Sequence, residues 1–151
     1  MTRAAPGQSR GRAAPLGPRR PKRPKYNFAG QLGDGTQTSR STPVQVRNLT
    51  GVVAVAAGGS HSLAVKSDGT LWAWGWNLRG QLGDGTTTDS REPKQVLTGV
   101  VAMEAGNSYS LAVKSDGTLW TWGTNDQGQL GDGTTTSRSM PGQLPGLPVR
   151  L

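Results

Sequence analysis

Few side chains in this sequence could carry out covalent or metal chemistry. There is no cysteine and a single histidine, His61, which excludes disulfides, a cysteine nucleophile, and thiolate or multi-histidine metal sites. The Gly-Asp-Gly-Thr segments lack the Gly-Lys-Ser/Thr sequence of a phosphate-binding loop. A glycosidase would need two positioned carboxylates, and no such pair is marked. We therefore expect no catalytic residue, no cofactor and no metal, and a protein that is not an enzyme.

Two tryptophan pairs could stack on bases or sugars. Trp72 and Trp74 lie two residues apart, as do Trp120 and Trp122, so each pair shares one face of a strand. The pairs recur in register and lie in the middle of their strands rather than at loop tips. We therefore expect the indoles to pack between neighbouring sheets, where their burial contributes several kcal/mol.

The net charge of +8 comes from one end of the chain. Residues 1–25 hold eight Lys and Arg and no acid, whereas residues 26–151 hold nine positive and nine negative side chains. Five prolines and little apolar surface predict a disordered basic arm at 1–25. The arm could neutralise phosphates of nucleic acid without reading the sequence, or could be a solvated linker or a misassigned gene start. The residues expected to contact phosphates are Arg19, Arg20, Lys22, Arg23 and Lys25.

The rest of the chain repeats. Gly-Gln-Leu-Gly-Asp-Gly-Thr occurs at residues 30–36, 80–86 and 128–134, and residues 61–75 differ from 109–123 at only two positions. Short apolar runs around Asp-Gly pairs predict hairpins. We expect strands at 52–57, 62–66 and 71–75, repeated at 100–105, 110–114 and 119–123, with 52–57 covered on both faces. A short outermost strand is expected at 44–46 and at 94–96, each after a proline.

This pattern predicts an all-β fold, because four antiparallel strands per 48–50 residues form one blade of a β-propeller. We assign the recurring residues to the frame of each unit: glycines for special dihedrals, aspartates for turns, tryptophans for packing, and His61 or Tyr109 for a strand junction. These residues are Gly30, Asp34, Gly35, Gly58, His61, Asp68, Gly69, Trp72, Trp74, Gly75, Gly80, Asp84, Gly85, Gly106, Tyr109, Asp116, Gly117, Trp120, Trp122, Gly123, Gly128, Asp132 and Gly133.

The segment 55–65, Val-Ala-Ala-Gly-Gly-Ser-His-Ser-Leu-Ala-Val, resembles the signature of the repeat family named after the regulator of chromosome condensation. The following Trp-Ala-Trp-Gly-Trp-Asn, then residues 80–85, are similar to the next stretch of that family. The second unit departs from the signature at Glu104 and Tyr109. The resemblance implies a seven-bladed propeller. The family's founder promotes nucleotide exchange on a small nuclear GTPase and docks on nucleosomes. No segment matches the founder's exchange loops, and the near-identical units look more like the bacterial type.

Seven units of this size would exceed the 151 residues of the chain. We therefore expect a fragment of about two blades at 26–147 with a tail at 148–151, open outer faces, and self-association through those faces. The first hypothesis is a non-catalytic scaffold for an unknown protein partner. The alternatives are guanine-nucleotide exchange and DNA or chromatin association through the arm. No signal peptide or membrane-spanning segment is seen, so no membrane partner and a cytoplasmic location are expected.

Overall fold

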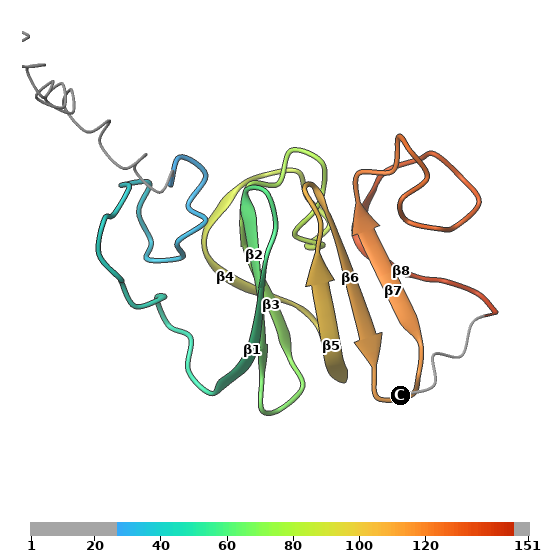
Figure 1. Cartoon of the computed structure of the whole chain (residues 1–151), viewed down its shortest axis with the longest axis horizontal. Coiled ribbons are helices and arrows are strands. Elements are labelled where there is room, and N and C mark those ends of the chain that lie inside the picture. Colours follow the sequence, from blue (N-terminus) through green and yellow to red (C-terminus); the bar gives the residue numbers. More distant parts are fainter. Residues whose placement is uncertain (1–26, 147–151) are drawn as a thin grey trace, which may run out of the picture.

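The computed structural model describes residues 27–146, which form two four-stranded antiparallel sheets. The expected arm, the tail at 148–151 and both end residues of the expected 26–147 domain lie outside this range. Neighbouring strands in the chain pair with each other, so each sheet is a simple meander, and Figure 1 shows the two sheets side by side. The first sheet contains β1 (Val52–Ala57), β2 (His61–Lys66), β3 (Leu71–Gly75) and β4 (Ser90–Leu97). The second contains β5 (Val100–Ala105), β6 (Tyr109–Lys114), β7 (Leu119–Gly123) and β8 (Arg138–Gln143).

The hairpins between β2 and β3 and between β6 and β7 turn at the expected Asp-Gly pairs. Gly69 has φ +80° and Gly117 φ +82°, a left-handed conformation that glycine adopts without a Cβ clash. The amide of Gly69 donates to the carbonyl of Lys66 at 2.9 Å, which closes the turn. These local signals therefore fix the strand register, in which Ala64 pairs with Trp72.

The main core lies between the two sheets. Side chains alternate along a strand, so Leu63, Val65 and Leu71 of the first sheet all face the second sheet. Trp122 of β7 packs against them with none of its surface exposed. Burying side chains of this size contributes about 2 kcal/mol each, so this contact provides much of the hydrophobic stabilisation.

The opposite face of the first sheet is covered by residues 27–49. Trp74, which is 5% exposed, forms a second cluster with Ala64 and Leu49, and Val46 and Trp72 pack beside it. In Figure 1 this covering segment, coloured blue to cyan, lies beside the first sheet on the side away from the second. Each tryptophan strand is thus covered by the chain segment that precedes it.

The expectation that residues 52–57 are covered on both faces is wrong. The strand forms, but Val53 and Val55 are 65% and 72% exposed. A continuous apolar run shows that a strand suits burial on both faces, but burial requires a neighbouring segment. Residues 27–49 cover Trp74 but leave Val55, on the same face of the sheet, exposed. Its counterpart β5 is better covered at its start, where Val100 is 3% exposed.

The expected outermost strand is confirmed in the first sheet and wrong in the segment before it. Residues 94–96 lie in the longer edge strand β4, which includes Pro93. Residues 44–46 form no strand. Within residues 27–146, no strand of either sheet lies beside residues 44–46 to pair with them. Among the described residues, no helix is long and apolar enough to cross a membrane.

Candidate interaction site between the two sheets

Each Gly-Gln-Leu-Gly-Asp-Gly-Thr loop is built around a buried asparagine. The side-chain amide of Asn77 donates to the carbonyls of Thr86 and Thr88, both at 3.0 Å, and its carbonyl accepts from the amide of Leu82 at 3.0 Å. Within the loop, Asp84 accepts from the backbone amide of Thr86 at 3.0 Å. The other two loops have the same framework, with Asn27 and Asn125 at the centre. The loops are therefore rigid turns held by hydrogen bonds.

The first two loops bind the tryptophan strand that follows them. The carbonyl of Gln31 accepts from Trp74 Nε1 at 2.9 Å and from Ser62 Oγ at 2.8 Å. The Gln81 carbonyl likewise accepts from Trp122 Nε1 at 2.9 Å and from a serine hydroxyl. Buried indole N–H groups need an acceptor, so these carbonyls position the sheets relative to their neighbours.

A histidine and a serine connect the two sheets beside that carbonyl. His61 Nε2 lies 2.9 Å from Ser110 Oγ, and Ser110 Oγ donates to the Gln81 carbonyl at 2.9 Å. The Ser110 hydroxyl has one proton and uses it on the Gln81 carbonyl, so His61 must donate to Ser110 from Nε2. In the neutral imidazole, Nδ1 is then unprotonated. Nδ1 has no hydrogen-bond partner among the described residues. Burial lowers the pKa of His61 from 6.5 to about 4, because desolvation disfavours the charged imidazolium.

This pair is not arranged for catalysis. His61 is 1% exposed and Ser110 is fully buried, so no substrate could reach the hydroxyl. The serine also directs its proton to a carbonyl rather than to the imidazole, whereas a nucleophile would need the imidazole as its base. In the second sheet, Tyr109 takes the position of the histidine. The pair therefore acts as a polar connection between the sheets.

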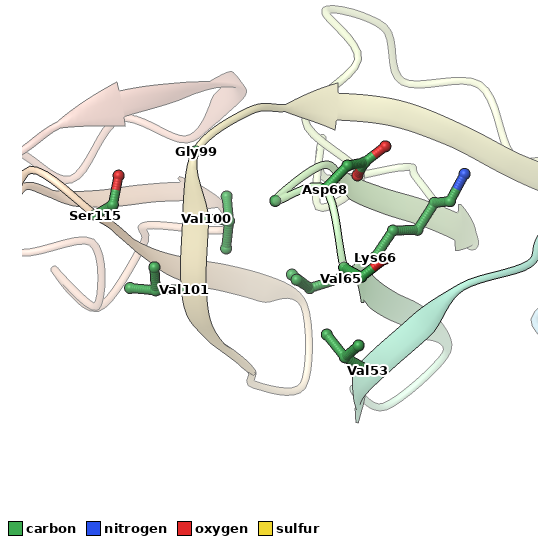
Figure 2. Close-up of a pocket in the computed structure, with 10 residues that line it drawn as sticks. Val53, Val65, Lys66, Asp68, Gly99, Val100, Val101 and Ser115 are labelled. Atoms are coloured by element: carbon green, nitrogen blue, oxygen red, sulfur yellow. The ribbon is translucent and has the colours of Figure 1, made fainter.

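Beside this core lies a groove of about 420 Å³ between the two sheets. Its apolar wall contains Val53 and Val65 from the first sheet and Val100 and Val101 from the second. Figure 2 shows these valines around the groove, with Asp68 and Lys66 at its edge. The amide of Val100 donates to the Gly69 carbonyl at 2.9 Å, which fixes the two sheets together here.

The charged edge of the groove is held in a defined geometry. Asp68 accepts from the hydroxyl of Thr70 at 2.6 Å and from its amide at 3.0 Å. The hydroxyl bond is the main reason why the pKa of Asp68 lies below its usual value. Thr70 Oγ1 in turn accepts from Trp72 Nε1 at 2.8 Å, and Lys66 Nζ lies 5.5 Å from the centre of the Trp72 ring. The groove thus presents an apolar wall, a fixed anion and a cation.

Few titratable side chains line this groove. Within residues 27–146, no group of three or more His, Asp or Glu side chains could hold a metal ion. The side chains that line the groove include no histidine and one carboxylate, Asp68. The groove thus combines one fixed carboxylate and one ammonium group with four valines.

The structure places most of the residues assigned to the frame of each unit in three settings. The Asp-Gly pairs lie in the loops and hairpins, the tryptophans lie on the faces of β3 and β7, and His61 and Tyr109 begin β2 and β6. Arg19, Arg20, Lys22, Arg23 and Lys25 lie outside the described residues. Sequence reasoning missed the buried asparagines Asn27, Asn77 and Asn125, although their recurrence at offsets of 50 and 48 was a usable signal. It also missed Gln31 and Gln81, because they act through backbone carbonyls.

Family models match most of this chain. The model described as "Regulator of chromosome condensation (RCC1) repeat" matches residues 26–65, 68–113 and 116–150. A second RCC1 repeat model matches residues 52–81 and 100–129. The matched ranges together contain both sheets.

Two human proteins are related in sequence over part of the chain. Probable E3 ubiquitin-protein ligase HERC3 from Homo sapiens is 37% identical over 73 residues, which are 46% of this chain and 7% of HERC3. RCC1 domain-containing protein 1 from Homo sapiens is 46% identical over 50 residues, or 32% of this chain and 13% of that protein. The chain therefore spans a small part of the curated relatives it matches.

Solved structures show the same fold. Human WBSCR16 has a TM-score of 0.67 and 28% identity, covering 78% of this chain and 33% of that one. Prp20p from Saccharomyces cerevisiae has a TM-score of 0.68 and 20% identity, covering 80% of this chain and 33% of Prp20p, and at that identity it shows the fold alone. The two sheets match propeller blades of these proteins, while the bacterial type of repeat stays a prediction. The chain belongs to the regulator of chromosome condensation (RCC1) repeat family.

Proposed function

We propose that this chain is a non-catalytic protein-interaction scaffold whose partner binds in the groove between the two sheets. The observation that carries the proposal is the apolar wall of that groove, where Val53 is 65% and Val101 49% exposed. Exposed apolar surface next to fixed polar groups is typical of binding sites. The rigid hairpin at Asp68 and the bond between the sheets at Val100 support a preformed site, which lowers the entropic cost of binding.

Substitutions in the wall can test this proposal without disturbing the core. A photo-reactive amino acid at Val53 should crosslink a discrete protein, and the same group at the exposed Thr87 should not. The captured protein is then purified and titrated against the wild type and Val53→Arg. We expect Val53→Arg to weaken binding at least tenfold, or about 1.4 kcal/mol, with an unchanged unfolding midpoint. Equal binding by the wild type and Val53→Arg contradicts the proposal.

A second candidate function is nucleic-acid association through residues 1–25. Their eight positive charges without an acid support it, because phosphate neutralisation releases counterions. Retention of DNA should fall steeply with salt and should disappear when residues 1–25 are deleted. Unchanged retention after deletion contradicts this candidate.

Guanine-nucleotide exchange is the alternative that the family resemblance suggests. Prp20p from Saccharomyces cerevisiae binds Gsp1p and histones, which is a property of that protein. A nucleotide-release assay with small GTPases separates the two functions, because a scaffold leaves the release rate unchanged.

A further inference from the structure

Two of the three identical loops hold a tryptophan, and the third does not. A Cβ added at Gly33 would lie 2.7 Å from Trp74 Nε1, and one at Gly83 would lie 2.7 Å from Trp122 Nε1. At Gly131, the equivalent position in the third loop, the nearest atom is a methyl of Leu144, the residue after β8, at 3.6 Å. Among residues 27–146 no side chain donates to the carbonyl of Gln129. The third loop therefore presents a tryptophan-binding carbonyl that is unused within this part of the chain.

The outer face of the second sheet repeats a surface that is buried inside the molecule. Leu63, Val65 and Leu71 face the second sheet and are buried there. The residues 48 positions later are Leu111, Val113 and Leu119, of identical type, and all three are half-buried. They line an apolar cavity of about 390 Å³. This face thus has the shape and chemistry of the one that already binds a sheet.

The face of the first sheet that points away from the second sheet is the surface that such a leucine face could bind. Met103 of β5 packs into the core between the sheets. Its counterpart in the first sheet is Val55, which pairs with Ala64 and is 72% exposed. The other part of that face, Trp74, is covered by residues 27–49. An intact second sheet could dock there only if this covering segment moved away.

We propose that two copies of this chain associate head to tail by loop exchange. Residues 128–134 of one copy replace residues 30–36 on Trp74 of the other, and the leucine face of the donor covers Val55 of the acceptor. Because the two loops have the same seven residues, the exchange preserves the indole bond and adds apolar contact. Residues 30–36 compete for Trp74 from within the acceptor's own chain, at a high effective concentration. Exchange is therefore favoured when the contact of this loop with Trp74 is weakened. The contact joins two different faces and can extend into longer chains.

One charge opposes this association. Glu104 lies on the outer face of the second sheet and lines the cavity there. The equivalent residue of the first sheet is Ala56, which packs against the core. Burying an unpaired carboxylate is costly. Association of the wild type should therefore be weak, and removing this charge should strengthen it.

Sedimentation equilibrium of the full-length chain tests the proposal. Gly33→Val should prevent the first loop from seating on Trp74 and should strengthen association at least tenfold over wild type. Adding Gly131→Val in the same chain should abolish it, because the donor loop then cannot approach Trp74 either. The proposal is overturned if folded Gly33→Val stays monomeric at about 100 μM, far above a micromolar dissociation constant, or if Gly33→Val and the double variant associate equally.

Glu104→Ala provides a test that does not disturb the loops. Since Glu104 is exposed, the variant should fold like wild type and associate at least tenfold more tightly, and Leu111→Asp in the Glu104→Ala chain should reverse the gain. If Glu104→Ala associates no more tightly than wild type, or if Leu111→Asp has no effect, the interface is not the one proposed.

Discussion

Acid should weaken the junction between the two sheets through His61. The pKa of this buried imidazole is about 4 in the folded protein, against 6.5 for an unperturbed histidine. As the pH falls below 6.5, the unfolded chain binds a proton before the folded one does. The free energy of unfolding must therefore decrease between pH 6.5 and about 4, and should be constant above that window.

The size of the effect follows from the two pKa values. Their difference, 6.5 − 4, is about 2.5; at about 1.36 kcal/mol per pKa unit this gives about 3 kcal/mol. The hydrogen bonds of His61 also favour a lowered pKa. Nε2 already donates to Ser110, so an added proton must go to Nδ1, which has no acceptor within the described structure.

The carboxylates titrate in a separate window. The hydroxyl of Thr70 lowers the pKa of Asp68, and the hydroxyl of Thr118 lowers the pKa of Asp116. A carboxylate with a lowered pKa stabilises the folded state above its unfolded value of 3.8, and this contribution is lost as the pH falls further. The decrease between pH 6.5 and 4 thus belongs mainly to His61.

Urea denaturation followed by tryptophan fluorescence from pH 4 to 8 measures the effect. The control is His61→Gln, whose amide can donate to Ser110 but does not titrate. We expect the wild type to lose about 3 kcal/mol across the window, and the variant to lose little. Because His61 is the only histidine in the chain, one NMR resonance reports its pKa directly. If wild type and variant lose stability in parallel, or if the resonance titrates near 6.5, the reasoning is refuted.

Three further predictions concern the repeated frame, each measured as a free energy of unfolding. Gly80→Ala and Gly128→Ala both place alanine at positive φ, which should cost each variant about 1–2 kcal/mol of stability. Gly80→Ala should lose more, because only there would the added Cβ meet the backbone, 2.6 Å from Ser139 Cα. Equal losses in the two variants would contradict this close approach. Asn77→Ala should cost about 3 kcal/mol because it leaves the buried Leu82 amide unpaired, and a loss below about 1 kcal/mol would show that water replaces the side chain. Lys114→Met should cost about 0.5–1 kcal/mol, because its ammonium lies 4.5 Å from the Trp120 ring centre; a loss that persists in high salt would point to packing instead.

Local signals explain why so much of the fold was predictable. An Asp-Gly pair determines a hairpin through the dihedral angles of one glycine. Two tryptophans two residues apart on a strand must share a face of the sheet. Both statements involve residues that are close in sequence. The strands around Gly69 and Gly117 and the family were accordingly correct from sequence alone.

Burial and partner choice depend on contacts between distant residues. The sequence could not show that Val55 is exposed while its counterpart Met103 is packed, because the difference lies in whether another sheet is present. It also could not show that backbone carbonyls at Gln31 and Gln81 bind the indoles, since a carbonyl has no residue-type signature.

The sequence by itself determined the repeat, the turn positions and the side of each strand that carries tryptophan, because steric limits on a few adjacent dihedrals fix them. The tertiary structure alone decided that His61 meets Ser110 across the sheets, that Val53 and Val101 border one groove, and that the third loop holds no tryptophan among the described residues. Those outcomes depend on how separate sheets stack, and stacking is driven by burial of apolar area, which is non-directional.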